Sequence, residues 1–236
     1  MAVIKRRSIV IFSAVLLTVF TFILCFAALS GSASGANGGG ITVVLDAGHG
    51  GIDGGVSGIK TGAKESEINL AVVKKLAEYF EDAGINAVLT RKSEAGLYGV
   101  ASGTLKRRDM EKRKEIIEKA QPVMVISVHM NYYASSDRRG AQVFYKSNDA
   151  LGKSLADNLQ KHLNGLYQGV KDYSALSGDY YILNCTEYPS VIAECGFLSN
   201  PYDEALLITP EFQSELAYSL FCGAINFLTD QSAVYF

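Results

Sequence analysis

The sequence lacks an excess of charge of either sign. Its 22 lysines and arginines nearly balance 24 aspartates and glutamates, which gives a formal net charge of −2 and a pI near 6.0. Without a bulk positive field, a protein attracts nucleic acid only weakly, and it must hold an anionic substrate through individual residues. We therefore expect no nucleic-acid partner.

Motifs that cradle phosphate are also missing. Neither G-x-G-x-x-G nor G-x-x-x-x-G-K-[ST] occurs, which excludes the usual nucleotide-binding loops. Cysteine is scarce: only Cys185, Cys195 and Cys222 lie outside the N-terminal apolar run, and an odd number argues against a disulfide framework. Without the N-terminal segment the chain has roughly 195 residues, which is enough for one domain with a substantial core, and no internal repeat occurs. We therefore expect residues 41–230 to fold as one domain.

The N-terminal segment has the pattern of an export signal. Lys5, Arg6 and Arg7 precede an uncharged run over residues 8–29, which is about the length of a helix that crosses a bilayer. We predict a signal peptide or membrane anchor over residues 1–30 and a flexible, glycine-rich linker over 31–40. Cleaved and anchored forms are both open, and both place the remaining chain outside the cytoplasm.

The rest of the chain alternates short apolar runs with helical patterns, which predicts an α/β domain. Helices are expected over residues 68–83, 107–120, 151–166 and 212–228. Strands are expected over residues 41–45, 85–90, 123–128, 140–145, 180–183 and 190–195, with 140–145 as a third or an edge strand. The first strand, the first helix and the second strand follow one another in the order of a β-α-β unit.

Two of the three histidines end buried strands. His49 follows the first strand inside a glycine-rich turn, and His129 follows the apolar run VMVISV. Glu65 opens the helix after the first strand, so these three side chains could converge at one side of the sheet. The third histidine, His162, lies on the apolar stripe of a helix, and we interpret it as structural.

Two histidines and one glutamate form a known ligand set for catalytic zinc, which leaves a position for water and lowers the pKa of that water to about 7. The spacing is not that of H-E-x-x-H, so the ligands must come from three separate segments. Glu67 is a competing ligand. An offset of two residues on a helix points it away from Glu65, so only one of them can face a metal.

Glu194 is the candidate catalytic carboxylate. It follows the apolar segment PSVIA, where a charge is costly unless it is paired or used, and it suits a general base. A structural alternative is a pair with Arg91 or Arg113. Cys195 as a nucleophile is disfavoured, because adjacent residues of a strand face opposite ways.

Several segments, taken in order, resemble the motifs of the zinc-dependent N-acetylmuramoyl-L-alanine amidases of the amidase-3 type. They are LDAGHGGIDGG, GAKESEINLAV, LTR, VISVHMN and PSVIAECGFLSNPYDE. The resemblance implies a mixed sheet flanked by helices, zinc ligands His49, Glu65 and His129, and catalytic Glu194. Ser66 stands where the family usually has lysine.

The same resemblance implies a reaction, which is hydrolysis of the amide between N-acetylmuramic acid and the L-alanine of the peptidoglycan stem peptide. Arg91 and Asn131 lie in two of the motifs and are candidates for substrate binding. The alternatives are a zinc peptidase that cuts within the stem peptide and a cell-wall-binding or regulatory protein without turnover.

A compact catalytic domain behind a short N-terminal segment is similar to the germination-specific, spore-cortex amidases, which prepare muramic acid for δ-lactam formation. This similarity implies a place in sporulation, in the intermembrane space of the developing spore, with a membrane contact through the N-terminal segment. Control would then come from a regulatory or activating partner protein.

Overall fold

The computed structural model describes residues 40–99 and 105–234. The predicted signal peptide or anchor and nearly all of the linker lie outside these residues. Within the described ranges, no helix combines the length and the apolar character that a membrane crossing requires. The elements are β1 (Thr42–Ala47), α2 (Glu65–Asp82), β2 (Asn86–Leu89), α3 (Leu105–Ala120), β3 (Met124–Asn131), β4 (Gln142–Lys146), α4 (Ala150–Asn164), β5 (Leu176–Gly178), α5 (Tyr181–Asn184), β6 (Ser190–Phe197), α6 (Pro201–Leu207) and α7 (Pro210–Val234).

The described strands form one mixed sheet in the order β2-β1-β3-β6-β4-β5. Strand β1 is parallel to both β2 and β3, and β3 is parallel to β6, whereas β4 runs antiparallel to β6. The α/β class, the mixed sheet and the initial β-α-β unit are confirmed. Since β1, β3 and β6 run the same way, their carboxyl ends meet at one edge of the sheet, where α/β proteins usually bind ligands.

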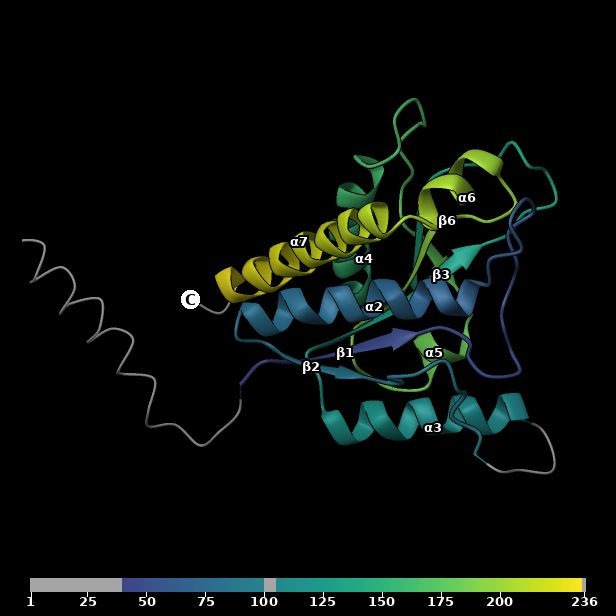
Figure 1. The fold of residues 1–236 in the computed structure, drawn as a ribbon. Coiled ribbons are helices and arrows are strands. Elements are labelled where there is room, and N and C mark those ends of the chain that lie inside the picture. The colour runs from purple at the N-terminus through teal and green to yellow at the C-terminus, as the bar shows by residue number, and fades with distance from the viewer. Residues whose placement is uncertain (1–39, 100–104, 235–236) are drawn as a thin grey trace, which may run out of the picture. The chain divides into compact units, whose positions relative to one another are not determined.

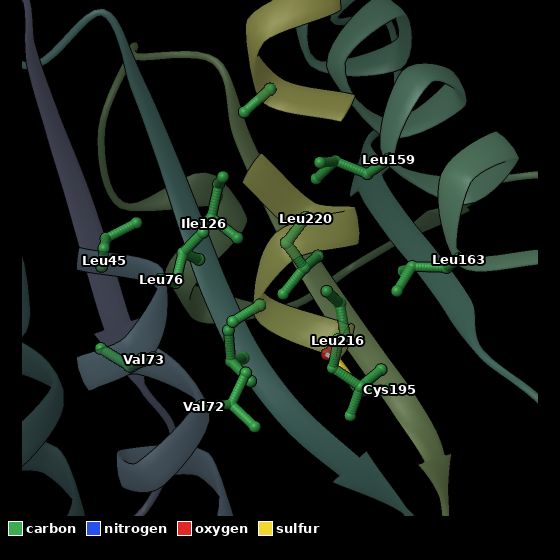
Figure 2. Packing of buried hydrophobic residues seen from close by; sticks show 14 of the residues in the cluster. Leu45, Val72, Val73, Leu76, Ile126, Leu159, Leu163, Cys195, Leu216 and Leu220 are labelled. Carbon is green, nitrogen blue, oxygen red and sulfur yellow. Dashed lines mark hydrogen bonds between the residues drawn. The ribbon is translucent and has the colours of Figure 1, made fainter. Parts of the chain in front are cut away.

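Helices cover both faces of this sheet, because its strands are apolar on both sides. On one face α2, α4 and α7 pack over Leu45, Ile126 and Cys195, and Figure 2 shows Leu76, Leu159 and Leu220 among the side chains of this cluster. On the other face α3 and α5 cover a smaller cluster of Val44, Ile117, Val125, Ile182, Leu183 and Ile192. Figure 1 shows α3 on the opposite side of the sheet from α2 and α7.

One predicted strand is wrong. Residues 180–183 were expected to be extended, but Tyr181–Asn184 forms the short helix α5. A four-residue apolar run has too little periodicity to separate a strand from a helical turn, so tertiary packing decides it. The expected 140–145 strand is present as β4, and it is not an edge, because β5 pairs with its far side.

Candidate metal centre and active site

The turn after β1 holds His49 in an unusual backbone conformation. His49 has φ = 61°, in the left-handed region that residues other than glycine seldom adopt, and Gly51 follows with φ = 64°. The peptide N–H of Gly48 donates to Val128 O at 3.0 Å, and the guanidinium of Arg113 donates to His49 O at 2.7 Å. These bonds fix the turn against β3 and α3, which keeps a strained residue in place.

Glu65 is the first residue of α2, and its side chain is only 3% exposed. Its Oε2 accepts a hydrogen bond from Val56 N at 2.9 Å, and its Oε1 accepts one from Met130 N at 3.2 Å. A Cβ at Gly55 would lie 2.3 Å from Oε2, so the approach of the carboxylate requires glycine there. The carboxylate is thus held by backbone groups of two segments.

The three candidate ligands meet at one point. Glu65 Oε1 lies 3.1 Å from His49 Nε2 and 2.9 Å from His129 Nδ1, and one ligand atom from each residue lies within 4.8 Å of the others. Two ligands about 2.0–2.1 Å from a tetrahedral zinc are roughly 3.3 Å apart. Nitrogen and carboxylate donors at this spacing fit zinc. Gly48 makes room for the set, because a Cβ there would lie 2.2 Å from Cε1 of His129.

Glu67 does not share this site. Its side chain is 48% exposed and pairs with Lys64 at 3.3 Å. The structure therefore places Glu65, and not Glu67, beside the two histidines. His162 lies apart from them, with its Nε2 2.8 Å from the amide of Asn226 between α4 and α7.

Charges and hydrogen bonds within this cluster shift the pKa values of His49 and Glu65. Burial lowers the pKa of His49, but hydrogen bonds and charges from Glu65 and from Asp53, at 2.9 Å from Nδ1, outweigh it and raise the pKa to about 9. Burial raises the pKa of Glu65, but His129 and His49 outweigh it and hold that pKa well below its usual range. Glu65 is therefore an anion at neutral pH, which suits a metal ligand.

Glu194 lies on β6 directly opposite His129 on the neighbouring strand β3. Its Oε2 is buried and has no hydrogen-bond partner among the described residues. Burial and the nearby charge of Glu65 raise the pKa of Glu194 to about 7, against the opposing effect of His129 and His49. A carboxylate whose pKa is near the working pH suits a general base and acid.

The contacts do not match an ion pair between Glu194 and Arg113, nor a role for Cys195 as a nucleophile. Arg113 pairs with Asp46 and with Asp109, at 2.7 Å from the latter, and not with Glu194. Cys195 points into the core beside Leu216 (Figure 2), and burial raises the pKa of its thiol far above the ordinary value, which makes it a poor nucleophile.

The two candidate substrate-binding residues lie near the ligands. Arg91 is 3% exposed, and its guanidinium donates to backbone carbonyls at Ala47, Gly48, Ser66 and Ser93, so it holds the turn that carries His49 against α2. Asn131 is half-buried two residues beyond His129, where its Oδ1 accepts from Tyr132 N at 2.8 Å. A substrate contact of either side chain stays a prediction.

Sequence reasoning missed the pocket beside the ligands. It has a volume of about 560 Å³, and its lining includes His49, His129, Arg113 and apolar side chains from α3 and α5, such as Met110 and Ile182. The signal for this pocket was the apolar run at residues 180–183, which we interpreted as a strand. In the structure this run belongs to the segment of helix α5 and lines one wall of the pocket.

The fold and these side chains define a class of protein: an α/β protein in which three side chains that could hold one metal ion lie beside a buried carboxylate, at the carboxyl ends of the parallel strands. The family model described as N-acetylmuramoyl-L-alanine amidase (Amidase_3) matches residues 43–226. The chain belongs to this family and is an amidase that acts on peptidoglycan.

Individual relatives agree with this assignment. The germination-specific N-acetylmuramoyl-L-alanine amidase of Bacillus subtilis (strain 168) is 31% identical over 196 residues, which is 80% of each chain. The CwlD amidase from Clostridioides difficile, solved in complex with the GerS lipoprotein, has a TM-score of 0.77 at 34% identity and covers 80% of this chain and 98% of its own. The catalytic domain of CwlV from Bacillus (Paenibacillus) polymyxa var. colistinus has a TM-score of 0.69 at 27% identity, with the same coverage.

The contrast between Glu65 and Glu67 yields a direct test of the ligand set. We expect Glu65→Ala to lower zinc affinity by at least 100-fold, because it removes one of three donors, whereas Glu67→Ala should change it little. Zinc titration against a chromogenic chelator measures both. The opposite ranking would show that Glu67 is the ligand.

Proposed function

We propose that this chain hydrolyses the amide bond between N-acetylmuramic acid and the L-alanine of the stem peptide, with one zinc ion held by His49, Glu65 and His129. The observation that carries the proposal is the convergence of these three side chains next to Glu194, which lies opposite His129 on the neighbouring strand and whose Oε2 has no partner in the part of the chain that the structure describes. Zinc bound there would polarise the amide carbonyl and acidify a water molecule.

Glu194 would move the proton in this reaction. As the water oxygen forms a bond to the carbonyl carbon, Glu194 takes the proton that the water releases. It then gives that proton to the nitrogen of L-alanine as the carbon–nitrogen bond breaks. In the metal-free protein the pKa of Glu194 is raised to about 7, so this carboxyl group can hold or release a proton near neutral pH. Its Oε2 accepts no hydrogen bond from residues 40–99 or 105–234, which keeps the carboxylate available.

Incubation of the purified protein with peptidoglycan, followed by mass analysis, tests the reaction. We expect free stem peptides that begin with L-alanine, together with glycan strands that have lost their peptides. A chelator should abolish their release, and added zinc should restore it. Fragments cut within the stem would indicate a peptidase instead, and binding without products would indicate a wall-binding or regulatory protein.

We also propose that the enzyme acts in the spore cortex, where removal of the stem peptide precedes formation of muramic δ-lactam. Support comes from the germination-specific amidase of B. subtilis and from the CwlD amidase of C. difficile. Residues 1–30 would export the chain and could anchor it, and in the developing spore this would put the enzyme in the intermembrane space. Deletion of the gene should yield spores without muramic δ-lactam, and spores of normal δ-lactam content would contradict the cortex role.

A partner protein is part of this proposal. The CwlD relative was solved in complex with a lipoprotein, and a comparable regulatory or activating partner would suit an enzyme that works at one place and time. Purification of the tagged chain from sporulating cells, with cross-linking, tests for such a partner. Recovery of the enzyme alone at its full activity would count against it.

A further inference from the structure

The side chain of Asn69 has no role in the reaction described so far, although it lies against the candidate metal centre. It is fully buried on α2, one helical turn after Glu65, and so on the same face of that helix. Its Nδ2 lies 3.3 Å from Glu65 Oε1 and 3.2 Å from Gly48 O. One amide thus donates to a ligand carboxylate and to the residue next to the ligand His49.

The orientation of this amide follows from its neighbours. Both Glu65 Oε1 and Gly48 O are acceptors, so only the NH₂ group of Asn69 can face them. Its Oδ1 then points elsewhere and is buried without a partner among the described residues. An unpartnered buried oxygen costs free energy, which offsets part of what the two donated hydrogen bonds contribute to the stability of the fold.

The rest of the buried face of α2 supports this reading. Apart from the residues of its first turn, the buried side chains beside Asn69 are apolar: Ile68, Leu70, Val72, Val73, Leu76, Ala77 and Phe80. An apolar residue at position 69 would match them and would avoid the burial of an amide. The fold could lose the Asn69 bonds, since Arg91 also donates to Gly48 O, at 3.0 Å, and Val56 N and Met130 N still hold Glu65.

We propose that Asn69 is a positioning residue for the metal centre: it orients the Glu65 carboxylate and locks α2 to the turn that carries His49. The inference rests on the zinc centre of the proposed function. Side chains that hydrogen-bond to a metal ligand fix its orientation and typically change metal affinity by about 10- to 100-fold. Asn69 would do this for two ligands at once, because its two acceptors belong to the segments of Glu65 and His49.

The test is zinc affinity in Asn69→Leu, which keeps the number and branching of the side-chain heavy atoms and removes both N–H donors. Asn69→Ala serves as a second variant, since it removes the same donors without adding bulk beside Gly48. We expect both variants to bind zinc about 10- to 100-fold more weakly than the parent protein. In the metal-free state, Asn69→Leu should melt within a few degrees of the parent, because only an incompletely bonded amide is lost.

The matched control is Gln160→Leu. Gln160 is 2% exposed on α4, away from the ligands, and its Oε1 accepts from Val143 N of β4 at 2.8 Å. This variant should lose stability and keep parental zinc affinity. Asn69→Leu and Asn69→Ala with zinc affinity within about threefold of the parent would overturn the inference, as would an equal loss in Gln160→Leu. A parent protein that binds no zinc would instead refute the proposed metal centre itself.

Discussion

Glu194→Gln is expected to lower turnover by about 10²- to 10⁴-fold while zinc content stays at the parental level. Glutamine keeps the shape of the side chain and removes its ability to take and return a proton. The carboxylate is not part of the ligand set, so the metal centre should persist. Kinetics with peptidoglycan fragments and metal analysis of the same preparation measure both quantities.

The control for this prediction is Glu187→Gln, which removes a carboxylate whose side chain is 95% exposed. It should change neither turnover nor zinc content. Loss of zinc in Glu194→Gln would show that the carboxylate supports the metal centre. Retention of near-parental turnover would show that another group transfers the proton.

Glu194→Gln should also raise the stability of the metal-free protein at pH 8. Burial raises the pKa of Glu194 from 4.5 to about 7, so the folded state disfavours the charged carboxylate and stability falls as the pH rises between these values. The shift corresponds to about 3 kcal/mol, which Glu194→Gln should recover above pH 7. Below pH 4.5 both proteins are neutral at this position, and the difference in unfolding free energy should disappear.

Much of this arrangement could be predicted from the sequence because the signals are local. A glycine-rich turn after an apolar run marks the end of β1, and VMVISV followed by His129 marks the end of β3. Parallel strands bring their carboxyl ends together, so two strand-ending histidines and a helix-opening glutamate meet without any long-range information. The α/β class followed from the same alternation of patterns.

The parts that sequence reasoning missed depend on long-range contacts. The left-handed backbone of His49 is held by Arg113, 64 residues away, and no local propensity predicts it. The helix at Tyr181–Asn184 forms where its two buried residues, Ile182 and Leu183, pack against α3 and β6. The apolar pattern of residues 180–183 is too short to show this. Asn69 had a readable signal, its spacing of four from Glu65, but an asparagine inside a helix has no specific meaning until its neighbours are known.

Arg113 is the centre of a buried charged cluster beside the turn that carries His49. It is 2% exposed, and its guanidinium pairs with Asp46 and Asp109 and donates to the carbonyls of Ala47 and His49. Burial lowers the pKa of Arg113, but the two aspartates outweigh it, so the side chain stays charged. Asp46 in turn accepts from Thr90 and Ser127, both at 2.6 Å, and keeps a lowered pKa despite its burial.

Arg113→Met should therefore destabilise the protein by about 3–5 kcal/mol, because it leaves Asp46 as a buried charge without its cation. Denaturant unfolding measures this loss. Arg107→Met on the same helix is the matched control, since Arg107 pairs with Glu111 on the exposed surface and its loss should have little effect.

The double variant Asp46→Asn, Arg113→Met separates charge from packing. If the cost arises from the uncompensated carboxylate, neutralising Asp46 should recover a large part of the stability, and the two substitutions will be strongly non-additive. Zinc affinity should be lower than in the parent protein both in Arg113→Met and in the double variant, because each lacks the bond from Arg113 to His49 O that holds the left-handed turn. Additive losses in stability would mean that the guanidinium of Arg113 acts mainly through its packing. Zinc affinity equal to that of the parent protein would mean that His49 keeps its conformation without Arg113.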